Sequence, residues 1–180
     1  MEKTKSLKKK YLNKSIGIIC YDSGGAEILS SFVRLNSGNY NFTLKGPAID
    51  IFKKNFKNLK NISLSKNLKI SNKFITGSGL GSDLEYKAIL KAKYNKKKVY
   101  TFLDHWTNYK KRFIRKKKII YPDQIWVGDL YAKKKVLKFQ KKVKVIKNPY
   151  FLEKKKIFKK IRKKINKNII LFASSNTDRI

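Results

Sequence analysis

Residue types that build metal sites, disulfides and nucleic-acid contacts are scarce in this sequence. Among its 180 residues, the chain has one cysteine, Cys20, and one histidine, His105. A single cysteine cannot form an intramolecular disulfide, and together with one histidine it is too little for a typical zinc site. We therefore expect no structural disulfide and no bound metal. We assign Cys20 to the core because it lies in an apolar run.

Long apolar runs are absent as well. The basic N-terminal segment 1–14 is followed by an apolar run at 16–20, which ends too soon for the core of a signal peptide. No run approaches the roughly 20 apolar residues that a membrane-spanning helix needs. The sequence therefore predicts a cytoplasmic protein, and it leaves open a peripheral position at the inner face of the membrane.

Lysine is the abundant residue type, and it gives the chain a formal net charge of +35. Excess positive charge is typical of nucleic-acid binding. Only five of the 46 basic residues are arginine, however, and arginine is the residue that best matches phosphate groups and guanine edges. The accompanying wealth of asparagine, isoleucine and tyrosine indicates an AT-rich coding sequence. We therefore expect no specific nucleic-acid partner.

The lysines are unevenly distributed along the chain. Five segments contain none, and these 81 residues carry eight of the eleven acidic residues: 15–44, 74–86, 99–109, 119–132 and 168–180. Their net charge is −6, whereas the remaining residues carry +41. Because burying an ammonium group is costly, the lysine-free segments should contain the core strands, the tight loops and any ligand cleft.

Apolar runs alternate with amphipathic stretches, which predicts an α/β, Rossmann-like layered domain with a mostly parallel sheet. The expected strands are 16–21, 39–44, 61–64, 74–76, 99–103, 124–127, 143–146 and 169–173. The expected helices are 26–35, 47–56, 82–95, 130–139 and 150–165. Ser82 and Glu85 have the spacing of a capping box at the start of the third helix.

The order of these elements predicts the domain organisation. We expect a basic segment at 1–14, a Rossmann-like domain at 15–148 and a bridging helix at 149–166. Residues 167–180 would then form the first strand of a second, truncated domain. The bridging helix has one apolar face and many lysines, a pattern that also suits a helix lying on an anionic membrane.

Two glycine-containing loops follow expected strands, at the sheet edge where open α/β folds bind ligands. The first, 22–25, has Ser23, Gly24 and Gly25 as candidate substrate-binding residues, because paired glycines let a ligand approach the backbone. A simple strand-to-helix turn is the alternative. The second, 76–83, contains three alternating glycines before a helix, and its candidates are Gly77, Ser78 and Gly79.

Acidic residues at the starts of the following helices indicate the kind of ligand. Glu27 follows the first loop, and Asp83 and Glu85 follow the second. Their carboxylates interact with the helix dipole and would repel a phosphate. We therefore expect a neutral polar ligand, such as a sugar hydroxyl, at both loops. For Glu85, a purely structural capping role is the alternative.

The third loop, 103–112, has the densest chemistry in the chain. His105 is a candidate general base or hydrogen-bond donor, and Asp104 is the second catalytic candidate. The two side chains diverge along an extended chain, so we do not expect a catalytic dyad. The candidates for binding substrate, by stacking or hydrogen bonding, are Trp106, Asn108, Tyr109 and Arg112. A structural loop is the alternative.

Six stretches together resemble one known family. They are 22–29, 44–48, 76–85, 103–113, 124–129 and 148–150, and the Asp-His-Trp-x-Asn-Tyr segment in the fourth is the most specific. Over roughly residues 16–150, the chain is similar to the N-terminal half of GT-B-type, glycosyltransferase-like proteins of bacterial polysaccharide gene clusters.

The resemblance implies two Rossmann-like domains facing a cleft, with the acceptor on the N-terminal domain and a nucleotide-sugar donor on the C-terminal one. By this similarity, the acceptor side would be lined by Ser23, Gly24, Gly25, Asp104, His105 and Asn108. The expected partners are a sugar or glycolipid acceptor and the nucleotide sugar, with no covalently bound cofactor. Because nearly all of the donor domain is missing, we expect the 180-residue chain alone to be inactive.

Two other functions fit the sequence. A nucleotide-sugar 2-epimerase of similar architecture would release epimerised nucleotide sugar without an acceptor. A lysine-rich protein that binds nucleic acid or an anionic membrane would show an affinity for nucleic acid that falls steeply with salt.

Overall fold

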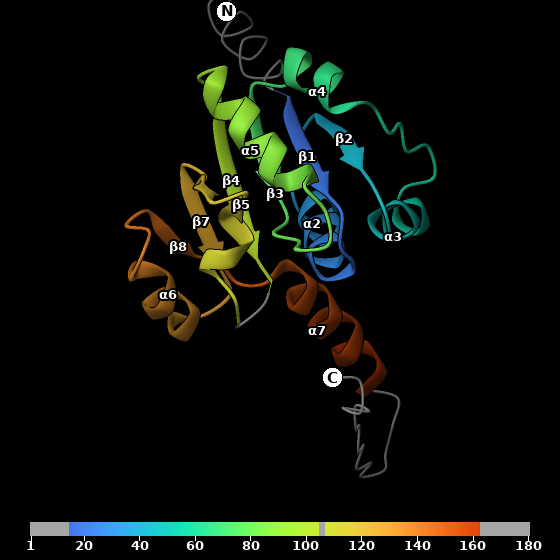
Figure 1. Ribbon diagram of the computed structural model, residues 1–180. Coiled ribbons are helices and arrows are strands. Elements are labelled where there is room, and N and C mark those ends of the chain that lie inside the picture. The colour runs from blue at the N-terminus through green and yellow to red at the C-terminus, as the bar shows by residue number, and fades with distance from the viewer. Residues whose placement is uncertain (1–14, 105–106, 163–180) are drawn as a thin grey trace, which may run out of the picture.

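The structure is a computed structural model that describes residues 15–104 and 107–162 (Figure 1). Segment 1–14, loop residues His105 and Trp106, the end of the expected bridging helix and the expected strand 169–173 lie outside the described residues. The expected truncated second domain therefore stays a prediction.

Six parallel strands form one sheet, which confirms the predicted α/β, Rossmann-like class. The strands are β1 (Ile16–Cys20), β2 (Tyr40–Leu44), β3 (Lys73–Thr76), β4 (Lys98–Leu103), β7 (Gln124–Val127) and β8 (Val143–Val145). Their order in space is β2-β1-β3-β4-β7-β8, and every pairing is parallel. The chain thus reverses its direction of winding between β1 and β3, which is the switch point where such sheets usually bind ligands.

Helices cover both faces of the sheet (Figure 1). One face packs against α2 (Ser23–Leu35), α3 (Ala48–Asn55) and the start of α7 (Pro149–Arg162). The other packs against α4 (Leu64–Ile70), α5 (Leu84–Tyr94) and α6 (Leu130–Leu137). Within β1, Ile18 and Cys20 join the first core and Ile19 joins the second, so the strand is apolar throughout because both of its faces are buried.

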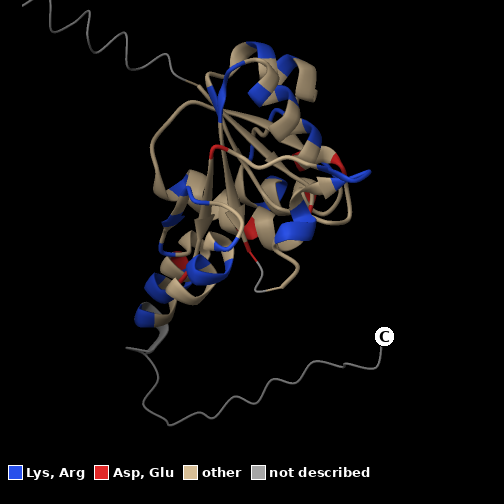
Figure 2. Ribbon diagram, turned by 60° about the vertical axis from the view of Figure 1, so that its left-hand side comes forward, with Lys and Arg blue, Asp and Glu red and all other residues tan. Residues whose placement is uncertain are grey.

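The lysines lie on the outside of this layered domain. No lysine of the described chain is among its buried residues, and Figure 2 shows the basic residues spread mainly over the outer helices and loops while the strands are mostly free of them. Strands β1, β2 and β7 lie within lysine-free segments, and β3 and β4 do so except for their first residue, whereas β8 contains Lys144 and segment 168–180 lies outside the described residues. Among the described residues, no helix has both the length and the apolar character needed to cross a membrane.

Two expectations about local structure were wrong. Segment 61–64 is not a strand, because Asn61 makes only an isolated bridge to Phe42, and Ser63 caps α4, a helix that the sequence pattern did not reveal. The Ser63 hydroxyl accepts the Lys66 amide at 3.2 Å. The first loop is also shorter than expected, since α2 begins at Ser23 and its first turn includes Gly24 and Gly25.

A small hairpin was missed as well. It follows a 3-10 turn at Lys110–Phe113 and pairs β5 (Ile114–Arg115) with β6 (Lys118–Ile119) in antiparallel fashion. Lys116 and Lys117 both have positive φ, 46° and 63°, as the two-residue turn of such a hairpin requires. Asparagine and glycine usually fill these positions, so the two lysines concealed the turn.

Candidate functional site

The three polar loops meet at the carboxyl edge of the sheet, because β1, β3 and β4 are neighbours. The Ser78 hydroxyl donates a hydrogen bond to Oδ1 of Asp104 at 2.9 Å, which joins the second loop to the third. A Cβ atom on Gly24 would lie 2.5 Å from Oδ2 of Asp104, which places the first loop beside the third. A Cβ atom on Gly79 would lie 2.3 Å from Oδ1 of Asp22. Glycine at these two positions is what allows the carboxylates to come so close.

Gly25 and Gly77 face each other above the Cys20 thiol. A Cβ atom added to Gly25 would lie 3.2 Å from the Cys20 Sγ and 3.4 Å from the Gly77 Cα. A Cβ atom added to Gly77 would lie 3.0 Å from the same Sγ. The two glycines therefore let the first and second loops pack directly against each other. Ser23 and Gly24, in contrast, are exposed at the surface of this edge.

A buried ion pair fixes the third loop. The Asp104 and Arg112 side chains are 4% and 5% exposed, and the Arg112 Nη1 lies 3.7 Å from the Asp104 Oδ1. The same Nη1 donates a hydrogen bond to the Ser78 carbonyl oxygen at 2.6 Å. A buried ion pair needs such additional hydrogen bonds to offset the desolvation of its two charges. Arg112 is thus placed to hold the loops together.

A second arginine clamps the glycine loop from outside. Arg115, on the missed hairpin, pairs through Nε with Oδ1 of Asp83 at 2.9 Å. Its Nη2 donates to the carbonyl oxygens of Ser82 at 3.0 Å and Gly79 at 3.3 Å. Two of the five arginines of the chain therefore position this loop, which is a structural use of a residue type that the sequence contains only rarely.

Glu85 belongs to this site, a role that its spacing from Ser82 concealed. The expected capping box is not formed, since the Ser82 hydroxyl accepts the Leu84 amide and Oε1 of Glu85 accepts the Tyr21 amide at 2.7 Å. The Glu85 side chain reaches the end of β1 instead. Glu85 is 3% exposed, and its Oε2 has no hydrogen-bond partner among the described residues.

The pKa of Glu85 is raised from 4.5 to about 7, chiefly by burial and also by the neighbouring Asp22. Hydrogen bonds from its own amide and from that of Tyr21, together with the charge of Arg115, act in the opposite direction. A carboxyl group with a pKa near neutrality can either donate or accept a proton under physiological conditions. Strongly shifted pKa values of this kind are typical of functional sites, although structural networks produce them too.

Three carboxyl groups surround the end of β1. Burial raises the pKa of the Cys20 thiol, and Glu85, Asp22 and Asp104 raise it further. The thiol therefore stays protonated, and Cys20 is a buried core residue as expected. Because Arg112 compensates Asp104, the negative character of this edge comes from Asp22 and from Glu85 when it is ionised, and it contrasts with the overall charge of the chain.

The remaining candidates of the third loop are split between the surface and the core. Asn108 is exposed, has a φ of 56° and lines a pocket of about 450 Å³ together with Lys135 and Lys138. Tyr109 packs in the core and is 6% exposed, so its ring has little open surface for stacking. His105 and Trp106 lie outside the described residues, and their roles remain predictions.

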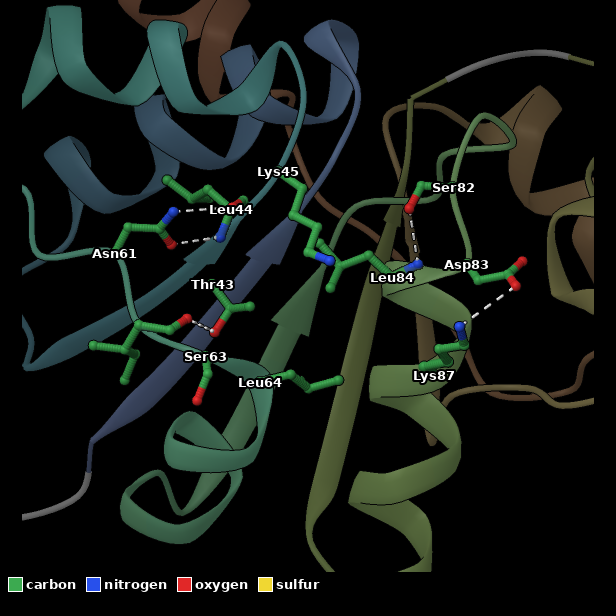
Figure 3. Close-up of a pocket in the computed structure, with 11 residues that line it drawn as sticks. Thr43, Leu44, Lys45, Asn61, Ser63, Leu64, Ser82, Asp83, Leu84 and Lys87 are labelled. Atoms are coloured by element: carbon green, nitrogen blue, oxygen red, sulfur yellow. Dashed lines mark hydrogen bonds and ion pairs between the residues drawn. The ribbon is translucent and has the colours of Figure 1, made fainter.

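A larger pocket of about 690 Å³ opens next to these loops (Figure 3). It lies between the end of β2, the segment that leads into α4 and the start of α5. The lining residues are Thr43, Leu44, Lys45, Asn61, Ile62, Ser63, Leu64, Ser82, Asp83, Leu84 and Lys87. Asn61 fixes one wall, because its amide group bonds both the NH and the carbonyl of Leu44, at 2.8 and 3.0 Å. No sequence motif indicated this pocket, since its lining comes from three separate segments.

The described residues contain no group of three or more His, Cys, Asp and Glu side chains suited to hold a metal ion. No model of a known protein family matches the chain, and no curated protein or solved structure matches it either.

Proposed function

We propose that this chain is the acceptor-binding half of a GT-B-type, glycosyltransferase-like protein of surface polysaccharide biosynthesis. In this proposal, a second domain that follows α7 binds the nucleotide-sugar donor. The chain by itself would bind the acceptor without transferring a sugar to it.

The observation that carries the proposal is the cluster of Asp22, Glu85 and Asp104 at the switch point of the sheet. Carboxylates accept hydrogen bonds from sugar hydroxyls, whereas they repel the phosphates of a nucleotide. Open α/β sheets bind their ligands at this edge. A polar, acidic edge therefore suits a sugar acceptor better than a nucleotide.

The exposure of these residues indicates which of them would contact the acceptor and which would position the loops. Ser23 and Gly24 are exposed and Asp22 is half-buried, so these three residues would contact the acceptor directly. Asp104 lies behind Gly24 and would position the first loop. For the proton of the acceptor hydroxyl, His105 remains the sequence-based candidate.

Saturation-transfer NMR on the full chain with a set of neutral mono- and disaccharides tests the acceptor role. We expect at least one sugar to give a signal, and Asp22→Asn to weaken its affinity about tenfold, since hydrogen bonds to a charged group contribute about 1.5–3 kcal/mol. Asp50→Asn, which removes an exposed carboxylate on α3, is the matched control and should bind as the unmodified chain does.

Two results would contradict the proposal. One is the absence of binding by every sugar tested. The other is equal loss of affinity in Asp22→Asn and Asp50→Asn, because this would trace the signal to overall charge. Incubation with nucleotide sugars provides a further check, since epimerised nucleotide sugar released without an acceptor would identify an epimerase instead.

A further inference from the structure

The pocket in Figure 3 has walls whose polar groups are already occupied. The Thr43 hydroxyl donates to the Ile62 carbonyl oxygen at 3.0 Å, and the Ser63 hydroxyl accepts the Lys66 amide at 3.2 Å. The Asn61 amide is held by Leu44, as described above. These hydrogen bonds fix the shape of the pocket, so a ligand would meet a preformed site.

The charged groups of the pocket leave one ammonium group available. Asp83 faces Lys87 at 3.7 Å and Arg115 at 2.9 Å, so its charge is compensated. Lys45 makes no side-chain hydrogen bond or ion pair with any described residue. In Figure 3, its side chain extends across the pocket toward Leu84. The pocket therefore has an excess of positive charge, which is placed on its one unpaired lysine.

This pocket is a neighbour of the acidic edge, and Tyr21 lies between the two. The Tyr21 ring packs against the residues beside Lys45 and Ser82, because a Cβ atom on Gly46 or Gly81 would lie 2.7 or 3.2 Å from it. The Tyr21 amide donates to Glu85 on the other side. The acidic edge and the pocket therefore lie on opposite sides of Tyr21.

We propose that this pocket binds an anionic substituent of the acceptor, a carboxylate or a phosphate group, through Lys45. The proposal rests on the proposed acceptor function and narrows its substrate class to acidic or phosphorylated sugars. An ammonium group donates strong hydrogen bonds to such oxygens. Asp22 and the ionised form of Glu85, on the far side of Tyr21, repel an anion, so the two sites together orient the ligand, with its neutral hydroxyls at the acidic edge.

Calorimetric titration of the full chain with glucose, glucuronate and glucose 6-phosphate tests this inference. We expect at least one of the two anionic sugars to bind about five- to tenfold more tightly than glucose at low salt, as for a single charge-assisted contact. Lys45→Ala should abolish this preference and leave glucose binding unchanged. Lys69→Ala, which removes an exposed lysine on α4, is the matched control and should retain it. Because Lys45 is exposed, the preference should also shrink at about 0.5 M salt.

Comparing the two variants distinguishes a specific anion site at Lys45 from nonspecific attraction by the many surface lysines. The inference is overturned if glucose binds as tightly as both anionic sugars, or if Lys45→Ala and Lys69→Ala reduce the preference equally. In either case, Asp22-dependent binding of neutral sugars would leave the proposed acceptor function intact. Conversely, if inorganic phosphate binds in a Lys45-dependent way while no sugar binds, the anion site stands and the acceptor function fails.

Discussion

The two edges of the sheet are both rich in polar residues, but they use them differently. Near the amino edge, Asn67 of α4 is fully buried against β2, and its side chain bonds the Asn41 carbonyl oxygen at 3.1 Å, the Thr43 hydroxyl at 3.0 Å and the Ser71 hydroxyl at 2.6 Å. Nearby, Ser15 bonds the Ile70 carbonyl oxygen at 2.7 Å. Charged groups of this edge have partners too, since Lys97 donates to the Ser71 carbonyl oxygen at 2.6 Å and Lys98 pairs with Asp123 at 3.5 Å.

At the carboxyl edge, the polar groups are acidic and crowd around the end of β1. Glu85 has an oxygen without a hydrogen-bond partner among the described residues, and its pKa is raised to about 7. Fully satisfied polar networks rigidify a fold, whereas a buried polar group without a partner costs stability, and strongly shifted pKa values cluster at functional sites. This difference, rather than polarity itself, distinguishes the candidate site from the framework.

The largest expected effect on the free energy of unfolding comes from a substitution at the amino edge. Asn67→Ala removes three buried side-chain hydrogen bonds and leaves Thr43 and Ser71 with fewer partners, so it should lower the free energy of unfolding by about 3–4 kcal/mol. Asn58→Ala, at an exposed position, should change it by less than about 0.5 kcal/mol. Urea denaturation measures both. Similar values for the two variants would show that the amino-edge network is not structural.

The next effect concerns the pH dependence of stability. The pKa of Glu85 is raised from 4.5 to about 7 in the folded chain, so the folded state binds the proton more tightly than the unfolded state does. Its contribution is therefore fully favourable below about pH 4.5 and is lost as the pH rises through about 7, with a total change of about 3 kcal/mol.

Glu85→Gln should remove this loss, because a glutamine oxygen can still accept the Tyr21 amide and does not ionise. The variant should therefore be more stable than the unmodified chain at pH 8 and similar to it at pH 4.5. Denaturation at the two pH values measures this. A variant that is less stable than the unmodified chain at pH 8 would mean that the ionised Glu85 carboxylate stabilises the fold rather than destabilising it.

A smaller effect is expected from adding one methyl group at the carboxyl edge. Gly79→Ala would place a Cβ atom 2.3 Å from Oδ1 of Asp22, and the required shift should lower stability by about 1–2 kcal/mol. At Gly128, the nearest atom to an added Cβ is 4.0 Å away, so Gly128→Ala is the control and should have almost no effect. Thermal unfolding compares the two. Equal midpoints would contradict the close packing of the first and second loops.

The sequence pattern predicted the main strands and the edge at which the polar loops gather. Apolar runs such as 16–20 identify strands buried on both faces, and Asp22 and Asp104 directly follow two of them. Helix α4 escaped prediction because its seven residues contain only three apolar positions, Leu64, Leu68 and Ile70, too few for a helical period to emerge. The hairpin at 114–119 escaped because lysines fill its turn.

Long-range contacts explain what else could not be predicted. The Glu85 carboxyl bonds an amide 64 residues earlier in the chain, and local spacing explained it equally well as a cap. The pocket beside Lys45 likewise joins segments that only the folded sheet brings together. Spacing along the chain indicates where strands end, but it does not reveal which side chains then meet.

The most direct test of the contrast between the two edges is amide chemical-shift mapping of the ¹⁵N-labelled chain during titration with a neutral sugar. We predict that the shifted amides belong to the carboxyl-edge loops 22–25 and 76–83 and to Asp104, and that those of Asn67, Ser71 and Asn72 stay in place. Shifts centred on the amino edge, or spread evenly over the lysine-rich helices, would contradict the assignment of the site.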